Sequence, residues 1–112
     1  MHEPVLYEIP LDDIVLEVAK ATGISRDCIH SLSRDRKGSL GRSLVAYLAR
    51  KLSGYLVKDV AAYFHREPAM ISQGMIKVEN LLRADEGLVE RLETIERRLI
   101  RDRRKRYLIT YA

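Results

Sequence analysis

Cysteine is almost missing from this sequence, in which Cys28 is the only one. A single cysteine excludes an internal disulfide framework and cannot begin a zinc motif of the CxxC kind, so we expect Cys28 to be a small buried apolar residue. Long apolar runs are also missing, since none approaches the roughly 20 residues that span a bilayer. Residues 1–10 lack the basic start and apolar stretch of a signal peptide. These absences predict a cytoplasmic protein that does not enter a membrane.

Signatures of catalysis are scarce too. No Walker GxxxxGK[ST] motif is present, and His2, His30 and His65 are isolated from one another. The acidic residues fall where helix caps and solvated helix faces are expected, and no grouping of Ser, His and Asp is evident. A small helical chain also offers little room for a substrate pocket. We therefore expect no enzymatic activity, no cofactor and no bound metal ion.

Charge is unevenly placed, although the net charge is only +4. Residues 1–17 contain five acids and no Lys or Arg, residues 34–51 contain six basic residues and one acid, and residues 97–106 contain seven basic residues and one acid. Arg and Lys commonly solvate helix faces, but two basic segments in one small domain favour a polyanionic partner.

Apolar residues recur at helical spacing from residue 11 onward. A first helix is predicted over residues 11–21, with Gly23 just past its end. A short second helix should follow Ser25, whose side chain stands where an N-cap is expected. Its inward-facing residues, together with Ile24, are predicted to be Cys28, Ile29 and Leu32.

The middle of the chain combines a basic loop with a buried helix. Residues 33–41 mix Ser, Gly and charged residues in the manner of an exposed loop. Residues 40–52 then have the spacing of a well-buried central helix that ends at Ser53 and Gly54. No run alternates polar and apolar residues as a half-buried strand would, so the predicted fold class is all-α. The length suits a single domain, placed at residues 1–106, with a tail at 107–112.

Residues 55–82 hold two short helices with an abrupt joint. The first has an apolar face made by Val60, Ala61 and Phe64, and the three residues after Phe64 are enough only for a turn. Pro68 has the fixed φ favoured at the first position of a helix, which puts Glu67 at the N-cap. Two such helices packed on a central one form a helix-turn-helix, whose second helix can enter a major groove about 12 Å wide.

The second of these helices has two distinct faces. Ile71, Met75, Val78 and Leu82 are predicted to face inward, and the residues left outward are Ala69, Ser72, Gln73, Ile76, Lys77 and Asn80. Pro68 and Ala69 permit close approach to DNA because they carry little bulk. Ser72, Gln73 and Lys77 can reach base edges or phosphates, and Gln suits the N6 and N7 edge of adenine. Gly74 costs roughly 1 kcal/mol relative to alanine, which we explain by close approach to the preceding helix.

The stretch GRSLVAYLARKLSGYLVKDVAAYF resembles the C-terminal DNA-binding domain (domain IV) of the bacterial replication initiator DnaA, a helix-turn-helix fold related to the Trp repressor. Matching positions are Arg42, Ala46, Leu48, Ala49, Leu52, Val60 and Phe64. KVENLL is similar to the KIE ending of the family, with Lys77 at its lysine. The resemblance covers about residues 7–100 and implies a Trp-repressor-like bundle of about six helices that binds double-stranded DNA.

This chain departs from that family after the turn. The family has the signature RDHTTV at this point, whereas this chain has REPAMI. Arg66 and Ile71 match, but Pro68, Ala69 and Met70 replace the His and two Thr that read the DNA box of the family, so we do not expect the same target sequence. The helix with small residues and serine also resembles the C-terminal domain of transposase-like proteins related to the REP-associated (IS200-like) tyrosine transposases. That resemblance implies a DNA-targeting fragment whose catalytic part lies elsewhere.

The predicted DNA contacts divide into positioning and reading. Arg34, Arg36, Lys37 and Arg42 are expected to contact phosphates or enter the neighbouring minor groove, Arg66 and Lys77 to anchor the helix-turn-helix, and Ser72 and Gln73 to read bases. The resemblance also supports Arg36, Lys37, Arg42 and Arg66. Neutralising roughly four to six phosphates predicts a log-log salt slope of about −4 to −5.

The last predicted helix, over residues 86–104, leaves two questions open. Its apolar stripe, Leu88, Leu92, Ile95 and Leu99, is expected to cover the core of the domain itself, but a protruding stripe would pair two copies into a homodimer. The tail RDRRKRYLITYA is expected to be disordered and solvated. The alternative to DNA binding is a protein-interaction module in which Met70, Met75 and Ile76 form a groove for a partner.

Overall fold

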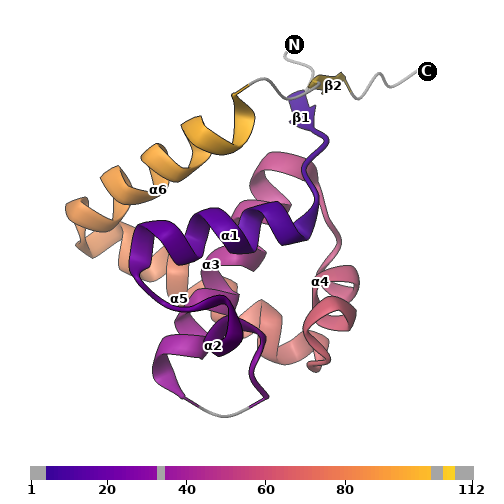
Figure 1. Ribbon diagram of the computed structural model, residues 1–112, viewed down its shortest axis with the longest axis vertical. Helices are drawn as coiled ribbons and strands as arrows, with labels where there is room; N and C mark the ends of the chain where they lie inside the picture. Colours follow the sequence, from indigo (N-terminus) through magenta and orange to yellow (C-terminus); the bar gives the residue numbers. More distant parts are fainter. Residues whose placement is uncertain (1–4, 33–34, 102–104, 108–112) are drawn as a thin grey trace.

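The computed structural model describes residues 5–32, 35–101 and 105–107 (Figure 1). Its helices are α1 (Leu11–Thr22), α2 (Arg26–His30), α3 (Arg36–Ser53), α4 (Val57–Phe64), α5 (Pro68–Ala84) and α6 (Glu86–Ile100). Two short strands, β1 (Val5–Tyr7) and β2 (Lys105–Tyr107), pair antiparallel. The predicted all-α class with about six helices is confirmed for this part of the chain.

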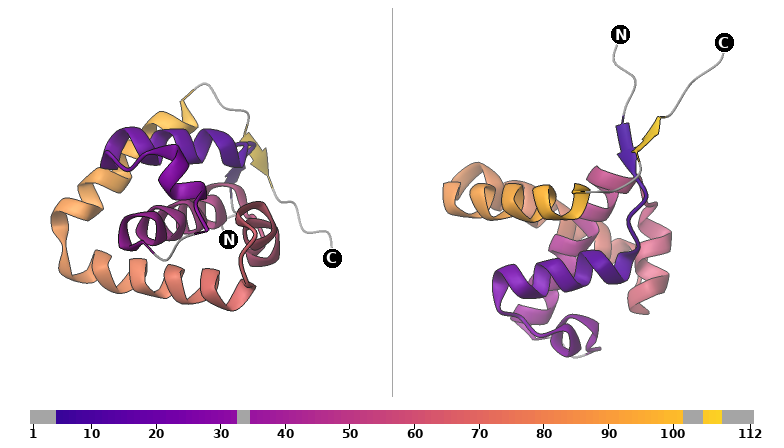
Figure 2. Two further views of the ribbon diagram at one scale, coloured as in Figure 1. Left: turned by 60° about the horizontal axis from the view of Figure 1, so that its bottom comes forward. Right: turned by 45° about the horizontal axis from the view of Figure 1, so that its top comes forward.

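Helix α3 is the centre of the fold. In the left view of Figure 2, α1, α3 and α5 form three levels, with α6 closing one side and α4 the other. α6 contacts both α1 and α5. Every helix contributes to one core, whose largest fully buried side chains include Phe64, Ile14, Ile29, Leu44, Leu48, Ile95 and Leu99.

None of the helices in the described ranges is both long and apolar enough to cross a membrane.

The joint between α4 and α5 lies where the spacing predicts it. α4 ends at Phe64, and the next residue, His65, has a φ of 55° in the left-handed region, which turns the chain sharply. α5 begins at Pro68, with Glu67 as its N-cap residue. The left view of Figure 2 shows α4 nearly end-on and α5 lying across the page, so the two axes cross steeply.

The start of α3 differs from the prediction. Residues 33–41 were expected to form an exposed loop, but α3 already begins at Arg36, with Asp35 as its N-cap. The helix also continues to Ser53, one residue past the predicted end. The predicted loop is therefore wrong from Arg36 onward, and residues 33–34 lie outside the described ranges.

Two glycines explain this difference. Gly38 and Gly41 are buried in α3 where α2 crosses it. A Cβ at Gly38 would lie 2.5 Å from the carbonyl oxygen of Cys28, and one at Gly41 would lie 2.7 Å from Cγ1 of Ile29. The two glycines therefore serve close helix packing rather than loop flexibility.

One prediction about α2 is wrong and another is confirmed only in part. Leu32 is 65% exposed because the chain becomes extended at Ser31, after the short helix has ended. Cys28 packs against the core as predicted but is only partly buried, and its Sγ lies 3.5 Å from Oδ2 of Asp35, the N-cap of α3. The N-cap prediction at Ser25 is confirmed, since its Oγ accepts a hydrogen bond from the amide of Cys28 at 3.1 Å.

Two short segments near the ends of the chain pair into a ribbon that was not predicted, and β2 lies within the tail that was expected to be disordered. β1 and β2 are three residues each, too short to display an alternating pattern, and their partners lie at opposite ends of the sequence. α6 ends at Ile100 rather than at residue 104, and β2 extends to Tyr107, across the predicted end of the domain.

The apolar stripe of α6 packs on the core of the same chain, as predicted. Leu92, Ile95 and Leu99 are buried and Leu88 packs against the core. The stripe is therefore not available as a pairing surface for a second copy.

Candidate nucleic-acid interface

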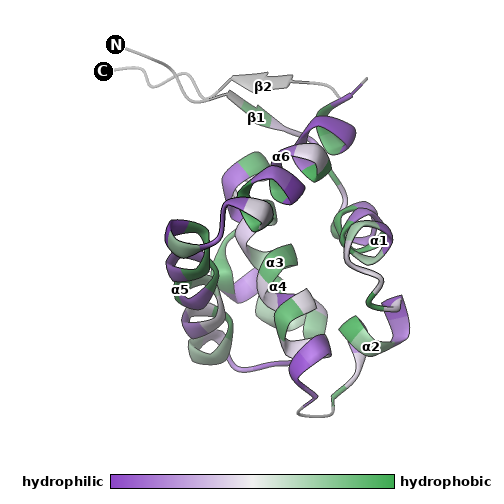
Figure 3. Ribbon diagram, turned by 90° about the vertical axis from the view of Figure 1, so that its left-hand side faces the viewer, coloured by the Kyte–Doolittle hydropathy of each residue, from purple (hydrophilic) through white to green (hydrophobic). Residues whose placement is uncertain are grey.

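Helix α5 lies at an edge of the molecule, with one face toward α3 and the other toward solvent (Figure 3). All four residues predicted to face inward do so. Ile71 and Val78 are buried, and Met75 and Leu82 are partly buried against the core. Of the residues predicted to face outward, Ala69, Gln73, Ile76, Lys77 and Asn80 are exposed, whereas Ser72 is half-buried. Ser72 is thus less accessible than its neighbours to a partner lying along α5.

Four of the exposed residues follow one line along α5. Ala69, Gln73, Ile76 and Asn80 stand at i, i+4, i+7 and i+11, which the period of 3.6 residues places on a single face. We call these four residues the α5 strip. None of them carries a charge, and Ile76 is 56% exposed.

The N-terminal end of α5 carries little bulk. Pro68 and Ala69 are exposed, and no acidic residue lies in the first turn of the helix. The unpaired backbone N–H groups at such an end can donate hydrogen bonds to an anion, and the helix dipole also favours negative charge there. A phosphate backbone could approach the main chain closely here.

Gly74 brings α5 against α3, not against α4 as predicted. A Cβ at Gly74 would lie 2.2 Å from Oγ of Ser43 and 3.1 Å from its Cβ, and Ser43 belongs to α3. The expectation of a close approach is right, but the helix that is approached is the central one.

Cations gather where the start of α3 meets α5. Arg36 and Lys37 are exposed in the first turn of α3, which contains no acidic residue. Arg36 and Lys77 line opposite sides of a hollow of about 440 Å³ between the two helices, together with Ser39, Leu40, Ser43, Val78 and Leu81. Two predicted phosphate contacts, Arg36 and Lys77, therefore meet at this hollow, and Lys37 follows Arg36 in the first turn of α3.

Arg42 was predicted to contact DNA, and the structure contradicts that role. The side chain is only 6% exposed, and its Nη1 donates to the carbonyl oxygens of Ile29 at 3.1 Å and Ser31 at 2.7 Å. Burial, and secondarily the nearby charge of Arg66, lower the pKa of the guanidinium. Arg42 satisfies carbonyls at the C-terminal end of α2, which would otherwise lack helical partners.

Arg66 combines a structural contact with partial exposure. Its Nη2 donates to the carbonyl oxygen of Ser31 at 3.0 Å, the same oxygen that Arg42 reaches. Arg66 thus ties the α4–α5 turn to the end of α2. Arg34, the remaining predicted contact, lies outside the described residues.

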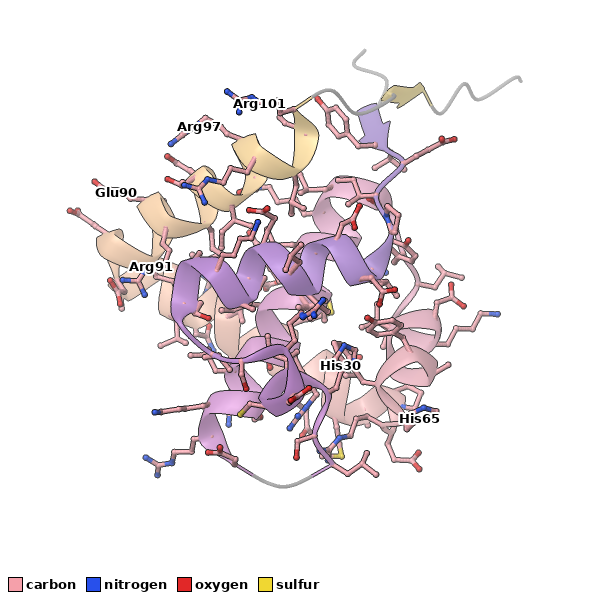
Figure 4. All side chains as sticks on the ribbon, in the orientation of Figure 1. His30, His65, Glu90, Arg91, Arg97 and Arg101 are labelled. Atoms are coloured by element: carbon pink, nitrogen blue, oxygen red, sulfur yellow. The ribbon has the colours of Figure 1, made fainter. Side chains whose placement is uncertain are left out.

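The second basic segment is on another part of the molecule. Figure 4 shows Arg97 and Arg101 on α6, at the opposite end of the view from His65 in the α4–α5 turn. Arg91 and Arg98 line a hollow of about 510 Å³ between α1 and α6. The described residues of the two basic segments therefore lie on different parts of the molecule, and whether both contact one polyanion stays a prediction.

A polar cluster that sequence reasoning missed joins three helices. The Tyr63 hydroxyl of α4 donates to the Asp12 carboxylate of α1 and lies 3.4 Å from Nε2 of His30 in α2. Burial and the Asp12 carboxylate raise the pKa of Tyr63. These residues are far apart in sequence, and no spacing rule would have paired them.

Among the described residues, no group of three His, Cys, Asp or Glu side chains could hold a metal ion. A hollow of about 730 Å³ near β1 is lined by Glu8 and Asp59 without any Lys or Arg, so it does not suit a polyanion.

No protein-family model, curated protein or solved structure was found to match this chain.

Proposed function

We propose that this domain binds double-stranded DNA in a sequence-specific manner, with α4 and α5 as a helix-turn-helix and α5 in the major groove. The observation that carries the proposal is the outer face of α5. It combines a slim first turn, Pro68 and Ala69, with Gln73 exposed one turn later and no acidic side chain in the first turn. The first turn of this face adds no negative charge of its own beyond that of the N-cap residue, Glu67, and can approach base edges.

The start of α3 supplies a second line of support. Arg36 and Lys37 stand at the positive end of a helix dipole, where cations reduce stability by about 0.3–1 kcal/mol each. Their position is unfavourable for the free domain but favourable once a polyanion is bound. Lys77 extends the same positive region onto α5.

The biological setting that we propose is the DNA-targeting domain of a transposase-like protein, acting in a bacterial cytoplasm. Its support is the resemblance of residues 7–100 to DnaA domain IV and of the REPAMI region to the REP-associated tyrosine transposases. The departure at Pro68, Ala69 and Met70 supports a target sequence different from the DnaA box.

Fluorescence-anisotropy titration of a labelled duplex across a salt series tests the proposal. Arg36, Lys37, Lys77 and Arg66 would neutralise about four phosphates, for a log-log slope of about −3.6. This is shallower than the sequence prediction because Arg42 is buried and because the count covers only described residues, which leaves out Arg34. Arg36→Gln/Lys37→Gln should weaken binding and reduce the magnitude of the slope by about 2.

Arg91→Gln/Arg98→Gln is the matched control, because it removes the same charge from the seam between α1 and α6. It should leave the slope nearly unchanged. A slope near zero for the folded wild-type protein, or equal effects of the two double variants, would contradict the proposal.

One observation favours a protein-interaction module as the second candidate. Leu40 and Leu81 are 38% and 43% exposed beside the hollow that Arg36 and Lys77 line. Apolar side chains between cations suit an acidic amphipathic peptide. Peptide binding that Leu81→Ser abolishes, combined with no DNA affinity at low salt, would favour this function over DNA binding.

A further inference from the structure

We infer that the base pairs read by the α5 strip are A·T pairs. This inference rests on the proposed DNA binding and specifies the class of sequence that the same surface takes. It follows from which side chains the fold leaves exposed along α5: Ala69, Gln73, Ile76 and Asn80.

The α5 strip is long enough to cover several base pairs. From Ala69 to Asn80 the helix rises by roughly 16 Å at 1.5 Å per residue. Successive base pairs are about 3.4 Å apart, so the strip spans about five of them. Gln73 and Ile76, which lie near its middle, are best placed to face base edges.

The chemistry of the strip matches the major-groove edge of A·T. Adenine presents N7 as an acceptor and N6 as a donor, which the side-chain amides of Gln73 and Asn80 can bind bidentately. Thymine presents a C5-methyl group, which apolar side chains such as those of Ile76 and Ala69 can contact. Amide and apolar side chains thus alternate along the strip, so that amides can bind adenine and apolar side chains can contact the thymine methyl group.

The groups that read G·C are not among the four residues of the strip, although Glu79 and Arg83 are exposed next to Asn80 at its C-terminal end. Guanine is most often read by Arg or Lys, and cytosine by Asp or Glu. Lys77 instead faces the hollow that it shares with Arg36 of α3. An isoleucine set against guanine or cytosine would also desolvate polar groups without replacing their hydrogen bonds, which is unfavourable.

Ile76 is the residue on which this specificity depends most. It is 56% exposed, although the apolar residues on either side of it in α5, Met75 and Val78, pack against or within the core. Its apolar surface contributes little to the folded domain and becomes buried only against a partner.

Selection from a randomised duplex library, followed by base replacement in the selected duplex, tests the inference. The selected site should contain A·T pairs at the contacted positions, and replacing one of them by G·C should weaken binding about 5- to 150-fold. Replacing thymine by uracil removes only the methyl group and should weaken wild-type binding about four-fold at the position that Ile76 contacts.

Ile76→Ser should bind thymine and uracil duplexes equally. Leu56→Ser is the matched control, because Leu56 is similarly exposed, at 51%, but precedes α4 and lies off the strip. It should retain the thymine preference. The uracil measurement on wild-type protein requires no variant and is independent of any effect of substitution on folding.

The possible results separate the inference from the proposed function. Salt-dependent binding with a selected G·C site, or with no loss at any uracil position, would overturn the inference and leave DNA binding standing. No binding to any duplex by the folded protein would overturn both.

Discussion

Gly74 of α5 and Ser43 of α3 lie so close that a Cβ at position 74 would come within 2.2 Å of the Ser43 hydroxyl oxygen. That hydroxyl donates to the carbonyl oxygen of Ser39 at 2.9 Å. The absence of a side chain at Gly74 lets α5 settle on the central helix. The contact also determines how the α5 strip lies relative to Arg36 at the start of α3.

Gly74→Ala should therefore destabilise the domain, although alanine favours helix formation. The new methyl group meets Ser43 Cβ at 3.1 Å even if the hydroxyl rotates away. Overpacking of this kind costs about 1–3 kcal/mol, against a gain of roughly 1 kcal/mol in helix propensity. Urea unfolding should show a net loss of about 1 kcal/mol, and Gly87→Ala in the first turn of α6, whose Cβ would meet only the exposed Asp85 side chain at 3.2 Å, should show a smaller loss or none. Equal stability of the two variants would contradict the contact.

Arg42→Lys should reduce stability by about 1–3 kcal/mol, because the Nη1 atom of Arg42 donates to both Ile29 and Ser31, and the differently shaped lysine side chain would leave at least one of these carbonyls without its charged donor. Arg36→Lys, at an exposed position, is the control and should leave unfolding unchanged. Thermal or urea unfolding of both variants measures the difference. If Arg42→Lys unfolds like wild type but binds DNA more weakly, the phosphate contact predicted from the sequence is correct after all.

Arg36→Gln/Lys37→Gln should change stability and DNA affinity in opposite directions. Removing two cations from the positive end of α3 should raise the free energy of unfolding by about 0.5–2 kcal/mol at low salt, while DNA affinity falls. Urea unfolding and anisotropy titration in one buffer measure the two effects. Parallel loss of both would instead indicate that these side chains support the fold.

Tyr63→Phe should reduce the loss of stability at alkaline pH. Burial and Asp12 raise the pKa of Tyr63 in the folded state above the ordinary value near 10. Below that value both states hold the proton, whereas at higher pH the unfolded state releases it first, so stability falls as pH rises. Urea unfolding at pH 8, 10 and 11 should show a smaller decline for Tyr63→Phe than for wild type. Tyr55, whose pKa burial also raises, is present in both proteins.

Much of the fold could be predicted because helix ends and faces depend on residues within a turn or two. Ser25 caps α2, Pro68 begins α5 and Gly23 ends α1, each in agreement with its local rule. The inward stripe of α6 was also predictable, because periodicity alone separates its two faces. The outer face of α5 followed in the same way, apart from the half-buried Ser72.

The sequence by itself therefore determined the all-α class, the approximate extent of most helices and the candidate α5 surface. The tertiary structure alone decided which helix Gly74 approaches, that Gly38 and Gly41 lie under α2, and that Arg42 is buried while Arg36 is exposed. The reason is physical: a glycine in a loop and a glycine under a crossing helix have the same local chemistry, and so do a surface arginine and a buried one. Only the neighbours brought by folding distinguish them.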